Sequence, residues 1–576
     1  MKRCPQCNRI ESDTSLAFCR VDGTALLPRS LEEDSGTIRF NSAPVSEAQT
    51  NVLSPATTDP GFGAIQQTTV LPSQNLHENT RPLGQRKLSP PIIVLLAVIA
   101  VAAIVVAYFY ARPKKATAIE SIAVLPFQNK STNADSEYLS DGLAESLIYR
   151  LSQLPNLKVS PTSSVMRYKG RDSDIAQVAK ELEVDAVMSG RLAQRGNDLT
   201  ISVELIDSRT KKLLWAEQYD RKMSDLLATQ REIATSITEK LQLKLSGDEK
   251  ALSKKYTNSN EAYQLYLRGR YHFAKRTKED VLKSIDYYQQ AIKVDPNFAL
   301  AYARMAEAYA QTPMYPYLSP GEAVPQAKAA AKKALELDPT LSEAYAAYGN
   351  TVTSFDWNWT EGERAFKRAI ELDPNSATAH YRYASEYLFA VGRYDEAITE
   401  VKRALELEPF DINMQANLAR AYLYAGQADK ALEQAQKAYD LEPNHVIARF
   451  TLGMVYNRKG LYDEAIRLSD ESLQANPANQ QMLSIRGYAY AKTGRRQEAE
   501  DSIAKLREIE KTQYVIHSFL AIIYGALDEK DKAFAELERG LKENESWLKW
   551  LNPDPMIDPL RDDPRFKEIL RRLNLK

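Results

Sequence analysis

The sequence predicts a multidomain protein. A small head with a zinc-ligand pattern and one transmembrane helix precede an α/β domain and an all-α repeat solenoid. Three observations support this fold class: an uncharged apolar run at Ile92–Tyr110, apolar runs of strand and helix length between residues 117 and 248, and regularly spaced prolines further along. A chain of 576 residues is too long for one hydrophobic core and should divide into several domains.

The overall composition excludes several protein classes. Hydrophobic residues make up 44% and charged residues 26% of the chain, as in ordinary soluble domains, so a polytopic membrane protein and a wholly disordered chain are excluded. The net charge of −1 disfavours nucleic acid as a partner of the whole chain, because proteins that bind phosphate backbones usually carry a basic excess. Phosphate-binding loops, zinc-protease motifs and nucleophile elbows do not occur, so we expect no enzyme activity.

Residues 1–28 carry the pattern of a metal-binding head. Cys4 and Cys7 form a Cys-x-x-Cys pair, and Cys19 and Asp22 stand at the spacing of a second pair. Thiolates with one carboxylate can complete a tetrahedral zinc site. The segment resembles the short zinc ribbons that begin many bacterial multidomain proteins, so we expect zinc as cofactor, with Asp22 or water as fourth ligand. A degenerate ribbon and a redox pair at Cys4 and Cys7 are the alternatives.

Residues 29–90 are predicted to be a disordered linker. No lysine or arginine occurs between Arg39 and Arg81, and polar residues and prolines dominate the segment. Such a composition cannot bury enough apolar surface to offset the entropy of ordering.

Residues 91–111 are predicted to be a transmembrane helix. The 19 residues of Ile92–Tyr110 contain no charge, and a helix of that length measures about 28 Å, enough to cross the lipid bilayer. Three basic residues flank the span on either side: Arg81, Arg86 and Lys87 before it, and Arg112, Lys114 and Lys115 after it. Because this charge count is a tie, the reduced thiols of a zinc site decide the orientation. We expect a single-pass inner-membrane protein with a cytoplasmic N-terminus and a periplasmic C-terminal region.

Residues 117–248 are predicted to form one α/β domain with the order βαβαββ(β)α. Apolar runs of strand length occur at 121–127, 157–160, 186–192, 200–206 and 213–219, and helical spacing occurs at 143–154, 175–182 and 233–245. Ile201, Val203 and Leu205 alternate with polar residues, which indicates a strand with one buried face.

Four segments of this region resemble the TolB amino-terminal-like domain: SIAVLPFQNKS, YLSDGLAESLIYRLS, RYKGRDSDIAQVAKELEVDAVMSGRL and LLWAEQYDR. In bacterial signalling proteins that domain often follows an output domain and a membrane span and precedes tetratricopeptide repeats. The resemblance implies interaction with a protein or small ligand, without a catalytic constellation. Six residues match the family's recurring positions, where structural roles are favoured over chemical ones: Asp141, Gly142, Gly190, Trp215, Tyr219 and Asp220.

Residues 258–545 are predicted to form about eight helix pairs, followed by a C-terminal cap at 546–576. Prolines at 296, 339, 374, 409, 443 and 477 are separated by 43, 35, 35, 34 and 34 residues. Each follows a small residue by five positions, and the 34-residue period resembles the tetratricopeptide pattern. The extra nine residues of the second unit, around Thr312–Pro316, are expected to be a surface insertion.

The tetratricopeptide resemblance implies a concave groove lined by the first helix of each pair. Some of the groove positions could instead be solvated helix faces. The residues predicted to bind a partner in this groove are Arg382, Glu386, Phe389, Asn413, Arg420, Tyr424, Phe450, Met454 and Asn457.

Two functions follow from this organisation. The first is a single-pass membrane scaffold or sensor that binds protein or peptide partners through its repeats, with the lipid bilayer contacted by one helix and no nucleic acid expected. The second is a signalling regulator whose cytosolic zinc-ribbon head couples to an output enzyme or nucleic acid.

Overall fold

The computed structural model describes residues 119–575 except 132–135, 153, 155–156, 172–173 and 242–255, together with three short strands near the N-terminus. The chain falls into two compact units, Met1–Val105 and Val106–Lys576. In the first unit, β1 (Lys2–Arg3) pairs antiparallel with both β2 (Ile10–Glu11) and β3 (Leu27–Pro28).

Two predictions concern residues outside the described parts of the chain. The zinc ligands Cys4, Cys7, Cys19 and Asp22 belong to this group, as does the apolar run Ile92–Tyr110. Among the residues that are described, no helix combines the length and apolarity needed to span a bilayer.

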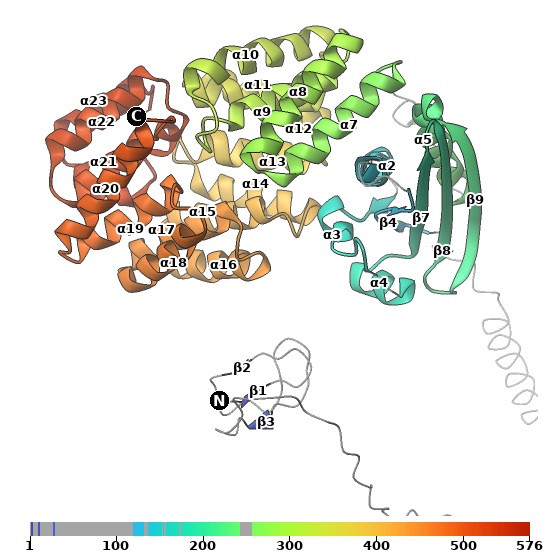
Figure 1. Cartoon of the computed structure of the whole chain (residues 1–576), viewed down its shortest axis with the longest axis horizontal. Helices are drawn as coiled ribbons and strands as arrows, with labels where there is room; N and C mark the ends of the chain where they lie inside the picture. Colours follow the sequence, from blue (N-terminus) through green and yellow to red (C-terminus); the bar gives the residue numbers. More distant parts are fainter. Residues whose placement is uncertain are drawn as a thin grey trace, which may run out of the picture. The chain divides into compact units, whose positions relative to one another are not determined.

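The expected α/β domain is present and is built on one mixed sheet (Figure 1). The strand order is β6-β4-β7-β8-β9, with β5 beside β7. β8 pairs antiparallel with both β7 and β9. β4 pairs in parallel with β6 and β7, and β5 pairs in parallel with β7. The strands are β4 (Ser121–Val124), β5 (Gln128–Asn129), β6 (Lys158–Val159), β7 (Ala186–Arg195), β8 (Asp198–Asp207) and β9 (Lys212–Lys222). The helical elements are α2 (Glu137–Ser152), α3 (Thr162–Met166), α4 (Ile175–Leu182), η2 (Met223–Asp225) and α5 (Leu226–Lys240).

Five of the six positions singled out in this domain have structural contacts within it. A Cβ at Gly190 would lie 2.0 Å from the ring of Phe127. Glu217 accepts hydrogen bonds from Trp215 at 3.1 Å and from Tyr219 at 3.0 Å. Asp220 accepts one from Thr200 at 2.8 Å, and Asp141 pairs with Lys169 at 2.6 Å.

The expected helical solenoid follows, with eight helix pairs within the described residues (Figure 1). The pairs are α7 (Asn260–Lys275) with α8 (Lys278–Val294), α9 (Ala299–Gln311) with α10 (Pro320–Leu337), α11 (Ser342–Phe355) with α12 (Trp359–Leu372), α13 (Ala377–Arg382) and the π-helical η3 (Tyr383–Leu388) with α14 (Tyr394–Leu407), α15 (Ile412–Tyr424) with α16 (Ala428–Leu441), α17 (Val446–Lys459) with α18 (Tyr462–Ala475), α19 (Gln480–Lys492) with α20 (Arg496–Glu510), and α21 (His517–Ala526) with α22 (Lys530–Lys542). The tail consists of η4 (Ser546–Trp550), η5 (Pro555–Leu560) and α23 (Pro564–Arg572).

The repeat signature has a direct structural cause. Asp338 and Asp373 are extended at the ends of α10 and α12, because each precedes a proline, whose ring disfavours a helical conformation in the residue before it. Ala334 and Ala369 are fully buried, so their small side chains permit close helix packing. Gly426, with φ of 74°, turns the chain between α15 and α16 in a conformation that other residues seldom adopt.

The extra residues of the second repeat differ from the expectation. Met314 is buried and Tyr315 packs against the same core, so this segment is not a surface insertion. The main-chain oxygen of Met314 accepts a hydrogen bond from Trp547 of the tail at 3.2 Å. The insertion therefore fills space inside the solenoid and contacts the C-terminal segment.

Candidate functional site

The structure buries eight of the nine residues predicted to line an open groove. Only Asn413 is partly exposed. The buried residues are Arg382, Glu386, Phe389, Arg420, Tyr424, Phe450, Met454 and Asn457. These eight side chains are therefore not open to a partner in this structure, and their role in partner binding stays a prediction.

The C-terminal tail covers these side chains. The Trp547 ring meets the Phe450 ring edge-on, with centroids 5.3 Å apart, and the Arg420 guanidinium lies 4.3 Å from the centroid of Trp550. Further along the tail, the sulfur of Met556 lies 3.7 Å from the amide nitrogen of Asn457. The tail thus occupies the inner face of the repeats, and 546–576 does more than cap the end of the stack.

A buried ion pair fixes the tail in this position. Lys549 is fully buried, pairs with Glu386, and donates a hydrogen bond to Ser354 at 2.6 Å. Glu386 also pairs with Arg382 at 3.0 Å. Burial lowers the pKa of Lys549, an effect that Glu386 opposes. Burial alone would raise the pKa of Glu386, but Lys549 and Arg382 hold it at about 2.

Tryptophan side chains add hydrogen bonds to this packing. The indole of Trp550 donates to the main-chain oxygen of Ser385 at 2.7 Å. Near the C-terminus, the oxygen of Leu573 accepts a hydrogen bond from Trp359 at 2.8 Å. These bonds satisfy polar groups that would otherwise be buried without partners. They connect the tail to repeats that are about 160 to 215 positions away in sequence.

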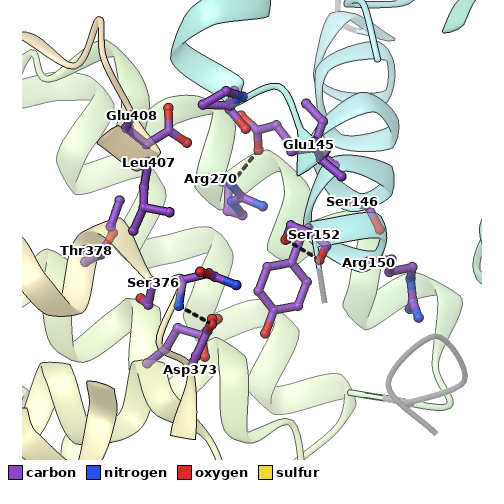
Figure 2. A pocket seen from close by; sticks show the side chains of 18 of the residues that line it. Glu145, Ser146, Arg150, Ser152, Arg270, Asp373, Ser376, Thr378, Leu407 and Glu408 are labelled. Atoms are coloured by element: carbon purple, nitrogen blue, oxygen red, sulfur yellow. Dashed lines mark hydrogen bonds and ion pairs between the residues drawn. The ribbon is translucent and has the colours of Figure 1, made fainter. Parts of the chain in front are cut away.

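A separate cavity lies between the α/β domain and the first repeats (Figure 2). Its volume is about 520 Å³, within the range of small-molecule sites. One wall consists of α2 and residues 157–162, and the other of α7, α9, α11, the loop before α13 with the first residues of that helix (373–378), and the end of α14.

Close packing and charge hold the two walls together. A Cβ at Gly142 would lie 2.8 Å from Leu267, so α2 approaches α7 closely where glycine leaves room. Glu145 of α2 pairs with Arg270 of α7 at 2.5 Å (Figure 2). The side chain of Glu408 accepts a hydrogen bond from the Ser163 backbone at 2.8 Å, and burial raises the pKa of that carboxyl. The cavity therefore lies between two docked domains.

Sequence reasoning missed both features. The tail carries Trp547 and Trp550 around Lys549, an aromatic density unusual for a solvated cap, and this signal could have suggested an inner position. The cavity has no comparable signal, because its walls come from segments up to about 260 positions apart.

Comparisons with protein families cover parts of the described region. Residues 117–236 match the family model of the second domain of HilA/YgeH-like transcriptional regulators. Residues 358–421 and 417–479 match tetratricopeptide repeat models. The repeats are therefore of the tetratricopeptide type, whereas membership of the TolB amino-terminal-like family stays a prediction.

Curated relatives share part of this chain. A putative adenylate cyclase 3 of Rhizobium meliloti is 33% identical over 195 residues, which is 34% of this chain and 33% of the relative. The transcriptional regulator HilA of Salmonella typhimurium is 27% identical over 242 residues, which is 41% of this chain and 42% of the relative. The chain thus spans less than half the length of these relatives.

Solved structures with similarity include tetratricopeptide proteins. PilF of Pseudomonas aeruginosa has a TM-score of 0.28 and 22% identity, over 36% of this chain and 92% of that one. YrrB, described as a protein of this repeat type with an unusual peptide-binding site, has a TM-score of 0.25 and 24% identity, over 35% of this chain and 97% of that one. By the family models, residues 117–236 are similar to the second domain of HilA/YgeH-like transcriptional regulators, and residues 358–479 are similar to tetratricopeptide repeats.

Proposed function

We propose that this chain is a membrane-anchored regulatory protein that binds protein partners through its tetratricopeptide repeats. The observation that carries the proposal is the docking of the α/β domain on the repeats, through Gly142 against Leu267 and the Glu145–Arg270 pair. Contacts of this kind can couple ligand or partner binding at one domain to the conformation of the other. The HilA match of 242 residues is too long to lie within residues 117–236 alone, which agrees with a module larger than the α/β domain.

We propose the outside of the repeats as the partner surface, because the tail occupies their inner face. An open groove of about 800 Å³ lies between α10, α11 and α12. Tyr345 and Tyr348 lie in it beside charged side chains of both signs, including Arg364 and Glu336. Tyrosine supplies large contact area at low entropic cost and is enriched in binding hot spots.

Photo-crosslinking tests this assignment. A photoreactive residue at Tyr345 of the full chain, in membranes of the native host, should yield an adduct with a partner protein. The same residue at Tyr439, which is also partly buried on a repeat helix, serves as the matched control. An adduct from position 439 but none from position 345 would contradict the outer groove as partner site.

The second candidate function assigns an output role to the head. Zinc held by Cys4, Cys7, Cys19 and Asp22 would shape a cytosolic domain that couples to an enzyme or nucleic acid. The names of the relatives, a putative cyclase and a transcriptional regulator, support a regulatory setting for this chain. Capture of a cytosolic partner that requires residues 1–28 would favour this function over the repeat scaffold.

A further inference from the structure

The cavity between the α/β domain and the repeats is balanced in charge. Five acidic and five basic side chains line it, among them Glu145, Glu343, Arg270 and Arg304. A polyanion such as a nucleotide would be repelled by the acidic side chains, and a polycation would be repelled by the basic ones. The matching ligand carries one group of each sign.

Two atoms in the wall are left without partners. Oxygen Oε2 of Glu343 and nitrogen Nε of Arg304 are buried and make no hydrogen bond with any described residue. Another guanidinium nitrogen of Arg304 pairs with Glu307 at 2.9 Å, so this side chain is held in place. Buried polar groups without partners are rare and costly, and these two have opposite charge.

Glu343 belongs to the repeats, but its charge reaches the α/β domain across the cavity. The pKa of Tyr149 in α2 is raised mainly by burial and secondly by the charge of Glu343. The pKa of Tyr256 is raised by the same two causes in the same order. Their hydroxyl groups lie 3.2 Å apart. Both phenols therefore stay protonated at neutral pH and offer polar contacts beside the carboxylate.

We propose that this cavity binds a small zwitterion that carries an ammonium and a carboxylate group, as free amino acids and dipeptides do. The ammonium group lies at Glu343 and the carboxylate lies between Arg304 and Arg270. Such a ligand contacts α7, α9 and α11 of the repeats and lies against α2 of the α/β domain. The inference rests on the proposed regulatory function, for which the zwitterion is the signal sensed at the domain interface.

Native mass spectrometry and calorimetry of the full chain test the proposal. The probes are the twenty amino acids and a set of unblocked dipeptides, each presented singly. Comparison of the two sets of probes shows whether the ligand is a free amino acid or a dipeptide, because the natural class should bind more tightly. For the best probe, acetylation of its amine or esterification of its carboxylate should weaken binding roughly tenfold or more, because each removes a charged hydrogen bond.

A matched pair of variants assigns the site. Glu343→Gln keeps the shape of the side chain and should weaken binding by the same factor. Glu371→Gln, at a side chain that is 64% exposed, should leave binding unchanged. The proposal is overturned if no amino acid or dipeptide binds, if blocked probes bind as well as free ones, or if Glu343→Gln has no effect. Retention of the Tyr345 crosslink in those cases would show that the inference fails while the proposed function stands.

Discussion

The buried Lys549–Glu386 pair gives a sharp prediction because its two members are not equivalent. Glu386 has a second cationic partner, Arg382 at 3.0 Å. Among the described residues, the other partners of Lys549 are uncharged: the Ser354 hydroxyl, and the Trp550 ring at 4.3 Å. Glu386→Gln therefore leaves a fully buried ammonium without a counter-charge. Removal of one partner from a buried pair costs about 3–5 kcal/mol of unfolding free energy.

Lys549→Met should cost less, about 1–3 kcal/mol, because Glu386 keeps Arg382 and methionine fills most of the lysine volume. The double variant should be less destabilised than the sum of the two single variants, since the residues are in contact. An exposed pair supplies the control. Glu336→Gln breaks a contact with Lys333 between side chains that are 65% and 45% exposed, and should cost about 0–1 kcal/mol.

Urea unfolding followed by tryptophan fluorescence measures these effects. The chain has five tryptophans. Trp547 and Trp550 lie in the tail, and Trp359 hydrogen-bonds to it, so the signal reports this region. Because the chain has several domains, midpoints of the tail transition are compared rather than one global free energy. Equal midpoints for Glu386→Gln and Lys549→Met, or strictly additive effects, would refute the reasoning.

Four further predictions follow from other parts of the chain. Burial raises the pKa of Asp554 to about 6, so the stability that its protonated form contributes is present below about pH 4 and is lost as the pH rises through 6. The urea midpoint should therefore fall between about pH 5 and 7. Asp554→Asn keeps an oxygen that can accept the 2.9 Å hydrogen bond from the Met556 backbone and should remove most of this pH dependence. Gly142→Ala should destabilise the α2–α7 packing by about 1–3 kcal/mol in the same assay, while Gly321→Ala, whose nearest neighbour would lie 4.0 Å away, should not. Metal analysis under reducing conditions should find one zinc per chain, lost in Cys19→Ala, and a metal-free wild type would remove the zinc prediction. A reporter fused after Lys576 should be active in the periplasm, and activity confined to the cytoplasm would reverse the predicted orientation.

Local patterns in the sequence predicted the elements that local physics determines. The alternation of Ile201, Val203 and Leu205 follows from the two faces of one strand, and all three are buried on β8. The repeat period follows from helix-pair geometry, and the prolines stop each second helix at the expected place. Both signals lie within a few dozen residues, where sequence spacing determines spatial contact.

The candidate site was predicted less well because it depends on distant contacts. Arg420 and Phe450 were expected to line an open groove, but the tail, more than 90 residues further along, packs against both of them. Met314 was expected in a surface loop because its contact with Trp547 of the tail also depends on a distant segment. The cavity at Glu343 depends on how two domains dock, and no periodicity within either domain encodes that geometry.

Hydrogen–deuterium exchange of residues 546–560 in the full chain tests the central claim, that the tail fills the inner face of the repeats. Amides of this segment, such as that of Leu551, which donates to Leu548 at 3.0 Å, should exchange as slowly as those of α15 and α17. Glu386→Gln should speed exchange of the tail before it affects the repeat helices. Complete exchange of 546–560 within seconds in the wild-type chain, with the repeats protected, would contradict the account.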